Sequence, residues 1–425
     1  MIKILKKADL RDKSILRRCS EPDPAVTASV SEIIKNVRAH GDAAVREYSI
    51  KFDGSCPDTL ELPREALAEA VNKVPSELLD VIREASRRIE RYHRAQLRQS
   101  YEVETDGTIL MMKVRPLDTV GAYVPGGTAP YPSTVLMNVV PAKIAGVKEI
   151  IMVSPPTCRG EISPVILATA YIAGVDRVFQ VGGAQAIAAL AYGTESIPKV
   201  DKIVGPGNAY VAEAKRQVFG PVGIDLVAGP SEILVISDGT SNPAVVAADM
   251  LSQAEHDKLS TAVLITTSEK LAKDTAAEIE KQLSVLPREA IARVSIENNG
   301  LILITDSIED AIDLANEVAP EHLELCVDNP FDYVSLIKNA GSVFLGKYCP
   351  EALGDYFSGT NHTLPTGGTA NYGSPLSVDD FIKKTSFTYY TAAALNTVKD
   401  SIALFARQEE LEGHARSVLS RGNSD

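Results

Sequence analysis

The sequence predicts an α/β protein with two Rossmann-like lobes built on parallel sheets, plus a helical N-terminal region and a helical C-terminal tail. From Val120 onward, short runs rich in Ile and Val alternate with helical segments, as expected for parallel sheets covered on both faces. Nine strand candidates suit two lobes better than one sheet. We therefore divide the chain into residues 1–118 (helical, packing on the second lobe), 119–236 (first lobe), 237–378 (second lobe) and 379–425 (tail).

The N-terminal region is predicted to be helical because its apolar residues recur at helical spacing among many charges. This pattern covers Val26 to Tyr48 and Pro75 to Tyr101.

The first lobe begins where the spacing changes to strands. We expect strands at Val120–Val124, Glu149–Val153, Arg177–Val181, Lys202–Val204 and Glu232–Ser237, with helices at Ser133–Ala145, Ser163–Ala173, Ala184–Tyr192 and Ala209–Phe219.

The second lobe repeats the alternation, and the tail leaves it. We expect strands at Thr261–Thr266, Leu301–Thr305, Leu323–Val327 and Ser342–Leu345, interleaved with helices at Pro243–Glu255, Glu269–Leu283, Ile308–Val318 and Tyr333–Asn339. In the tail, Asp379–Tyr390 and Leu395–Leu419 resemble helices that dock on a partner subunit.

Composition excludes several classes of function. The 425 residues are 45% hydrophobic and 23% charged, and no apolar run approaches the length of a membrane span. The net charge of −13 argues against nucleic acid or an anionic membrane as a partner. Five dispersed cysteines, with no CxxC pair, and an N-terminus too short in apolar residues for a signal peptide predict a cytoplasmic protein.

Glycine-rich turns follow three strands of the first lobe. They are Gly126-Gly127, Gly182-Gly183 and Gly205-Pro206-Gly207-Asn208. Glycine at the start of a helix lets the backbone approach a phosphate, and the helix supplies unpaired N–H donors. The GxGxxG fingerprint is absent, so the turns indicate either routine tight connections or an unusual mode of dinucleotide binding.

A carboxylate and an imidazole stand side by side at Glu321-His322, between a predicted helix and a predicted strand. Two titratable groups at a strand mouth can move two different protons. The alternative is an ordinary capped loop.

Metal-ligand residue types are scattered through the second half of the chain. Gln253 and His256 are three residues apart on one helix face, and Asp355 and His414 follow at a distance. Two imidazoles, a carboxylate and an amide oxygen would complete a zinc shell, although this spacing alone does not establish one.

Many of these segments together resemble the histidinol dehydrogenase family. The matching segments are Tyr123-Val124-Pro125-Gly126-Gly127, Val181-Gly182-Gly183-Ala184-Gln185-Ala186, Val204-Gly205-Pro206-Gly207-Asn208, Ala228-Gly229-Pro230-Ser231-Glu232, Gln253-Ala254-Glu255-His256, Ala319-Pro320-Glu321-His322-Leu323-Glu324, Gly354-Asp355-Tyr356 and Gly359-Thr360-Asn361-His362-Thr363-Leu364-Pro365-Thr366. Glu409 and His414 extend the match into the tail.

The resemblance implies a zinc-dependent oxidation of L-histidinol to L-histidine through the aldehyde, using two NAD. It implies one zinc per subunit, a homodimer with shared active sites, a first lobe on the dinucleotide side, and a second lobe with the zinc and the catalytic pair. The implied catalytic bases are Glu321 and His322, and the implied zinc ligands are Gln253, His256, Asp355 and His414. The implied substrate contacts are Ser231, His322, His362, Glu409 and the zinc ligands. The implied dinucleotide contacts are Tyr123, Gln185 and Asn208.

Two other functions compete with this interpretation. A related zinc- and NAD-dependent dehydrogenase would act on another polar alcohol, such as a sulfonated diol. Glu409 favours histidinol, because a carboxylate suits a cationic substrate better than a sulfonate. A binding protein without catalytic activity would not need Glu321 beside His322.

Overall fold

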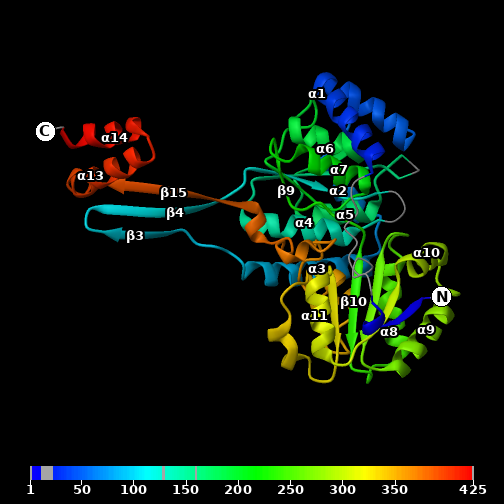
Figure 1. Cartoon of the computed structure of the whole chain (residues 1–425). Coiled ribbons are helices and arrows are strands. Elements are labelled where there is room, and N and C mark those ends of the chain that lie inside the picture. The colour runs from blue at the N-terminus through cyan, green and yellow to red at the C-terminus, as the bar shows by residue number, and fades with distance from the viewer. Residues whose placement is uncertain (1, 11–22, 127–129, 158–159, 424–425) are drawn as a thin grey trace. The chain divides into compact units, whose positions relative to one another are not determined.

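The computed structural model describes residues 2–10, 23–126, 130–157 and 160–423 (Figure 1). The chain forms two compact units. The larger unit comprises Met1–Gln96 and Leu117–Phe381, and the smaller unit comprises Leu97–Pro116 and Ile382–Asp425. Two parallel six-stranded sheets in the larger unit confirm the predicted α/β class with two lobes.

The first sheet has the strand order β2-β7-β6-β5-β8-β9, and only the β2–β7 pairing is antiparallel. Ile151 and Val153 of β6 enter one buried cluster, and Ile150 and Met152 enter the cluster on the opposite face. This alternation places apolar side chains on both faces, so helices must cover both. The strands are β2 (Glu61–Leu62), β5 (Thr119–Tyr123), β6 (Glu149–Ser154), β7 (Arg177–Gln180), β8 (Lys202–Val204) and β9 (Gly223–Ile224), and the interleaved helices are α4 (Pro132–Ala145), α5 (Pro164–Ala173), α6 (Gly183–Tyr192) and α7 (Ala209–Val218).

The second sheet has the strand order β1-β12-β11-β10-β13-β14, and all its strands are parallel. The N-terminal strand β1 (Lys3–Lys6) lies at its edge, beside β12 (Figure 1). The other strands are β10 (Glu232–Ser237), β11 (Thr261–Thr266), β12 (Leu301–Ile304), β13 (His322–Cys326) and β14 (Ser342–Leu345), and the helices of this lobe are α8 (Pro243–Ala254), α9 (Glu269–Leu283), α10 (Glu289–Asn299), α11 (Ile308–Val318) and α12 (Glu351–Tyr356).

The N-terminal helices pack chiefly on the first lobe, and not on the second lobe alone as predicted. They are α1 (Pro24–Asp53), α2 (Arg64–Val71) and α3 (Ser76–Arg94). Helix α1 contacts α6 and α7, α2 contacts α5, and α3 contacts α4. Helix α3 also contacts the second lobe, where the guanidinium of Arg88 lies 4.8 Å from the centre of the Phe357 ring. Their apolar stripes complete clusters that the first sheet begins, with Val30 and Val37 of α1 fully buried there.

Two further details differ from the sequence prediction. Strand β10 pairs with β11 and β13, so the expected boundary at residue 236 cuts a strand of the second lobe. The segment predicted as a helix at Tyr333–Asn339 is the 3-10 helix Pro330–Leu336. The other 3-10 segments of the described residues are Lys7–Asp9, Thr369–Asn371, Val378–Phe381 and Ser420–Asn423. Across the described ranges, no helix combines the length and apolar character that crossing a membrane requires.

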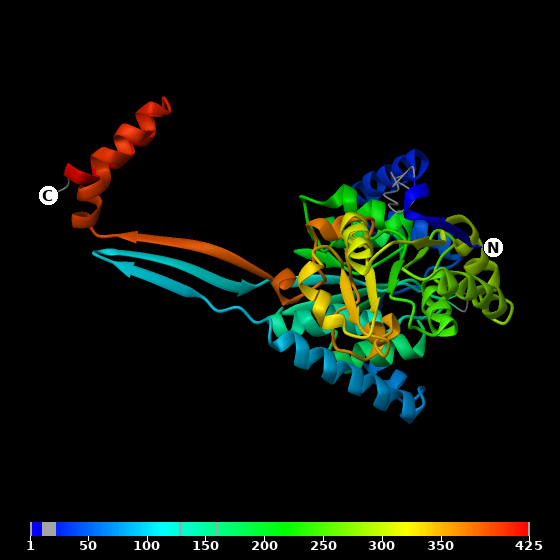
Figure 2. The ribbon, with the colours of Figure 1, turned by 60° about the horizontal axis from the view of Figure 1, so that its bottom comes forward.

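The smaller unit is an antiparallel sheet of β3 (Tyr101–Thr105), β4 (Thr108–Pro116) and β15 (Ile382–Tyr390), followed by α13 (Ala392–Gln408) and α14 (Glu412–Leu419) (Figure 2). The predicted helix at Asp379–Tyr390 is therefore wrong, as is the helical end of Pro75–Tyr101. Residues 382–390 are rich in Thr, Phe and Tyr, which favour strands, and they pair with β4 along their full length.

The register of β15 can be tested with a disulfide. Ser386 lies opposite Met112, so the double variant Ser386→Cys/Met112→Cys should form a disulfide on mild oxidation. Ser386→Cys/Leu110→Cys is the control, because this diagonal pair is about 7–8 Å apart, too far for a bridge. Thiol titration and peptide mapping measure both. Equal cross-linking in the two variants would contradict the assigned register.

Candidate active site

The predicted catalytic pair lies in the protein interior at the amino end of β13. Glu321 precedes the strand and His322 begins it, between Ile233 of β10 and Ser342 of β14. Their exposed fractions are 7% and 4%. The pair therefore sits at the opposite end of the strands from the carboxyl edge where most α/β ligands bind.

One hydrogen bond sets the tautomer of His322. Its Nδ1 lies 2.9 Å from the carbonyl oxygen of Glu232, which can only accept, so Nδ1 carries the proton and donates. The lone pair is then on Nε2, which has no hydrogen-bond partner. Burial lowers the pKa of His322 to about 4, against the opposing charge of Asp355. His322 is thus a neutral imidazole with one free basic nitrogen.

Glu321 is held by the backbone of the neighbouring strand. Its Oε2 accepts from the N–H of Glu232 at 2.8 Å, and the N–H of Glu321 donates to Oε2 of Glu232 at 3.3 Å. Burial raises the pKa of Glu321 well above the usual range, and the charges of Glu232 and Asp355 act in the same direction. A carboxyl with a raised pKa in a buried site suits proton transfer near neutral pH.

Gln253 has the properties of a metal ligand. It lies near the end of α8, is 1% exposed, and neither of its amide atoms has a hydrogen-bond partner of normal geometry. A buried amide without partners is costly, so it indicates a group that a ligand satisfies.

His256, Asp355 and His362 form the adjoining part of the site. Nδ1 of His362 is 3.5 Å from Oδ1 of Asp355. Burial would raise the pKa of Asp355, but the hydrogen bond and charge of His362 hold it below its usual range. Burial lowers the pKa of His256, although the Asp355 carboxylate opposes this shift. An ionised carboxylate and a neutral imidazole are the forms in which these groups bind a metal.

Sequence reasoning missed Glu351, the first residue of α12. It is 2% exposed, its Oε1 lies 3.7 Å from Nε2 of His322, and burial together with Asp355 raises its pKa to about 8. Ligand atoms of His322, Glu351 and Asp355 lie within 4.8 Å of one another. Nothing in the sequence distinguishes this glutamate from other helix-starting acids.

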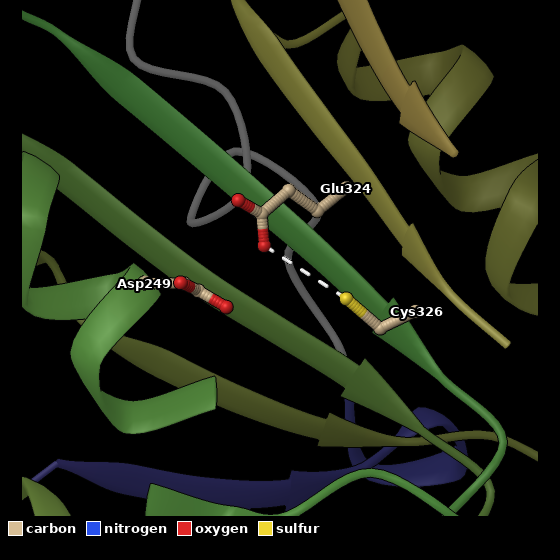
Figure 3. A group of neighbouring side chains, drawn as sticks. All are labelled: Asp249, Glu324 and Cys326. Atoms are coloured by element: carbon tan, nitrogen blue, oxygen red, sulfur yellow. Dashed lines mark hydrogen bonds between the residues drawn. The ribbon is translucent and has the colours of Figure 1, made fainter. Parts of the chain in front are cut away.

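A second group of titratable side chains is formed by half-buried Asp249 of α8 with buried Glu324 and Cys326 of β13 (Figure 3). Oε1 of Glu324 accepts from the N–H of Glu351 at 2.7 Å, and Sγ of Cys326 is 3.9 Å from Oε2. Glu324 therefore fastens the start of α12 to β13. A charged residue inside an apolar strand was the sequence signal for it.

The cysteines outside β13 that the structure describes play no part in this group. Cys56 and Cys349 are free thiols, whereas Cys19 and Cys158 lie outside the described residues.

The predicted dinucleotide contacts lie at the carboxyl edge of the first sheet. The hydroxyl of Tyr123 accepts from the N–H of Gly183 at 3.2 Å, and Gln185 is buried with Oε1 unpartnered. Oδ1 of Asn208 caps α7 by accepting from the N–H groups of Tyr210 and Val211, which leaves the amide NH₂ for a ligand. Gly127, part of one predicted glycine turn, lies outside the described residues.

The other predicted substrate contacts are dispersed. Ser231 directly precedes β10, and its carbonyl accepts from the N–H of Thr261. Glu409 ends α13 and His414 lies in α14, both exposed residues of the smaller unit.

Comparison with known proteins gives a consistent result. The family model described as histidinol dehydrogenase matches residues 16–422. Histidinol dehydrogenase of Listeria innocua is 54% identical over 403 residues, covering 95% of this chain and 94% of the relative. That of Bacillus anthracis is 55% identical over 400 residues, covering 94% and 93%. The crystal structure of histidinol dehydrogenase from Elizabethkingia anophelis aligns with a TM-score of 0.93 at 39% identity, covering 99% of this chain and 98% of that one. This chain belongs to the histidinol dehydrogenase family, a family of NAD-dependent oxidoreductases.

Proposed function

We propose that this protein oxidises L-histidinol to L-histidine through L-histidinaldehyde, reducing two NAD, as the final step of histidine biosynthesis. The observation that carries the proposal is the buried Glu321–His322 pair, in which one imidazole nitrogen is free to accept a proton and a neighbouring carboxyl has a raised pKa. Two different bases fit a reaction that removes protons first from an alcohol and then from a water.

We assign removal of the alcohol proton to His322. Its Nδ1 is committed to the Glu232 carbonyl, so Nε2 accepts the hydroxyl proton as hydride leaves the carbinol carbon for the nicotinamide. The low pKa keeps the ring neutral and able to accept at physiological pH. After this proton has passed to solvent, the same nitrogen accepts a hydroxyl proton again as the hydrated aldehyde loses its hydride.

We assign the activation of the water to Glu321. As the carboxylate, it removes a proton from the water that adds to the aldehyde, and its two contacts with Glu232 hold it in place. Separate bases for the two oxidations make the two half-reactions separable by mutation.

The residues present fit one zinc ion per subunit, held by Gln253, His256, Asp355 and the His414 of a second subunit. The two unpartnered atoms of Gln253 support this assignment. When bound, the ion would orient the nitrogen atoms of the substrate and stabilise negative charge near them. We include Ser231, His362 and Glu409 among the substrate contacts, and the Glu409 carboxylate suits the cationic imidazole better than the sulfonate of a competing diol.

We place NAD at the carboxyl edge of the first sheet, in contact with Tyr123, Gln185 and Asn208. The unpartnered Oε1 of Gln185 and the free NH₂ of Asn208 support this placement, since both can bind polar groups of a ligand.

We propose a homodimer with shared sites, in which the tail of each subunit brings Glu409 and His414 to its partner. The smaller unit exposes many large apolar side chains, which a one-layer sheet does not bury. They are Tyr101, Val103, Leu110, Met111, Phe387, Tyr389, Tyr390, Ile402, Leu404, Phe405 and Leu411.

The role of Glu321 predicts a selective defect. Glu321→Gln should slow oxidation of added aldehyde by about 10²-fold or more, while oxidation of the alcohol to the aldehyde slows far less. Because the pKa of Glu321 is raised, its active carboxylate is lost as pH falls, so wild-type aldehyde oxidation should decline toward acidic pH and the variant should lack this decline. Single-turnover NADH formation from each substrate measures both, and equal loss in both half-reactions would contradict the role.

The metal assignment predicts loss of turnover on chelation, with recovery on adding zinc. Gln253→Ala should lower zinc affinity at least tenfold, because it removes a ligand, whereas Gln282→Ala on the neighbouring helix should not. Metal analysis after dialysis against a competing chelator measures affinity independently of activity. Full activity in a sample shown to be free of metal would exclude the zinc assignment.

The shared site predicts complementation between two inactive chains. A dimer that combines His414→Ala on one chain with His322→Asn on the other keeps one intact site, so it should show about half of wild-type activity. Differently tagged chains allow the mixed dimer to be purified and assayed against both parent dimers. Activity no higher than that of the parents would mean that each subunit builds its own site.

A further inference from the structure

A buried ion pair lies directly behind the glycine turn that ends β8. Lys215 of α7 pairs with Asp225, which follows β9, and both side chains are 1% exposed. They contact the two peptide groups on either side of the Gly205 Cα. Asp225 Oδ2 accepts from the N–H of Gly205 at 2.8 Å, and the ammonium of Lys215 donates to the Gly205 carbonyl at 2.9 Å.

The backbone conformation and close packing of Gly205 leave no room for a side chain. Its φ of +107° is in the range that L-residues rarely adopt, and a Cβ there would lie 2.2 Å from the carbonyl oxygen of Tyr123. The turn therefore packs its backbone against one predicted dinucleotide contact and leads directly into another, Asn208. A rotation of either peptide group that flanks Gly205 would displace both.

Stability alone does not account for this pair. Two fully buried charges lose their hydration, and apolar residues of similar volume often serve stability as well or better. Hydrogen bonds to the N–H and the C=O of one residue do what apolar residues cannot: they fix the orientation of the two peptide groups on either side of its Cα. Asp225 is itself anchored, because its N–H donates to the carbonyl of Ile203 in β8 at 3.2 Å.

We propose that Lys215 and Asp225 are positioning residues for the dinucleotide: by holding the two peptide groups that flank Gly205, they keep the turn from Gly205 to Asn208 and the start of α7 in the conformation that binds NAD. Neither side chain is exposed, so neither contacts the cofactor itself. The inference rests on the proposed dinucleotide site at Tyr123, Gln185 and Asn208.

Paired substitutions test it without leaving a lone buried charge. Lys215→Met/Asp225→Asn keeps an acceptor for the Gly205 N–H and loses the donor to its carbonyl, whereas Lys215→Met/Asp225→Leu loses both contacts. The KM for NAD should rise about fivefold in the first variant and about fiftyfold in the second, because the turn is progressively released. The KM for histidinol and the zinc affinity should not change, and kcat at saturating NAD should change less than twofold.

The same sheet supplies a control pair at its other edge, where the side chains are 33% and 34% exposed. Lys143 pairs with Asp176 at 2.8 Å, and Asp176 also accepts from a backbone N–H, that of Ile150. Because Asp176 precedes β7, this pair lies at the amino edge, away from the glycine turns. Lys143→Met/Asp176→Asn should leave the KM for NAD unchanged. An equal rise in the control would show a general structural effect and overturn the proposal.

Asn208→Asp separates failure of this inference from failure of the dinucleotide site. It keeps the oxygen that caps α7 but removes the NH₂ donor, so it should raise the KM for NAD if the site is correct. If Asn208→Asp raises KM and folded Lys215→Met/Asp225→Asn does not, the positioning role is wrong and the site stands. If Asn208→Asp has no effect, the site itself is misplaced. Should the Asp225→Leu variant fail to fold, the Asp225→Asn variant alone decides.

Discussion

The hydrogen bond between His322 and the Glu232 carbonyl is the constraint on which the proposed chemistry depends. A backbone carbonyl cannot donate, so it fixes the proton on Nδ1 and leaves Nε2 basic. The carbonyl is held in turn by the parallel pairing of β10 with β13. A sheet is rigid on the scale of a proton transfer, and the tautomer of the base is therefore set by the fold and not by a mobile side chain.

The same two strands also determine the state of Glu321. Its contacts with Glu232 run in both directions between the ends of β10 and β13, and burial disfavours its charged form. Burial acts oppositely on the two members of the pair, because the charged form is the deprotonated carboxyl in one and the protonated imidazole in the other. The same buried environment therefore raises the pKa of Glu321 and lowers the pKa of His322, which suits the two groups to different proton transfers.

Much of the fold could be predicted from the sequence because parallel strands and amphipathic helices have strong periodic patterns. Val120–Val124 and Glu149–Val153 were placed almost to the residue, since buried strands are continuous apolar runs. Residues 382–390 were not, because this nine-residue strand is exposed along nearly its whole length, lacks an apolar run and directly follows a 3-10 segment. The position of α1 could not be predicted either, because an apolar stripe does not specify which lobe it covers.

The candidate site could likewise be predicted only in part from the sequence. Glu321, His322 and Gln253 were identified from motifs, but the burial of Glu351 and Glu324 arises only when α12 meets β13. Glu324 accepts from the first N–H of α12, one turn before Asp355, and approaches Asp249, one turn before Gln253. Glu324 thus links to one strand, β13, the two helices that carry these proposed metal ligands. These contacts join residues 27 apart (Glu324 and Glu351) and 75 apart (Asp249 and Glu324), and no local pattern in the chain encodes them.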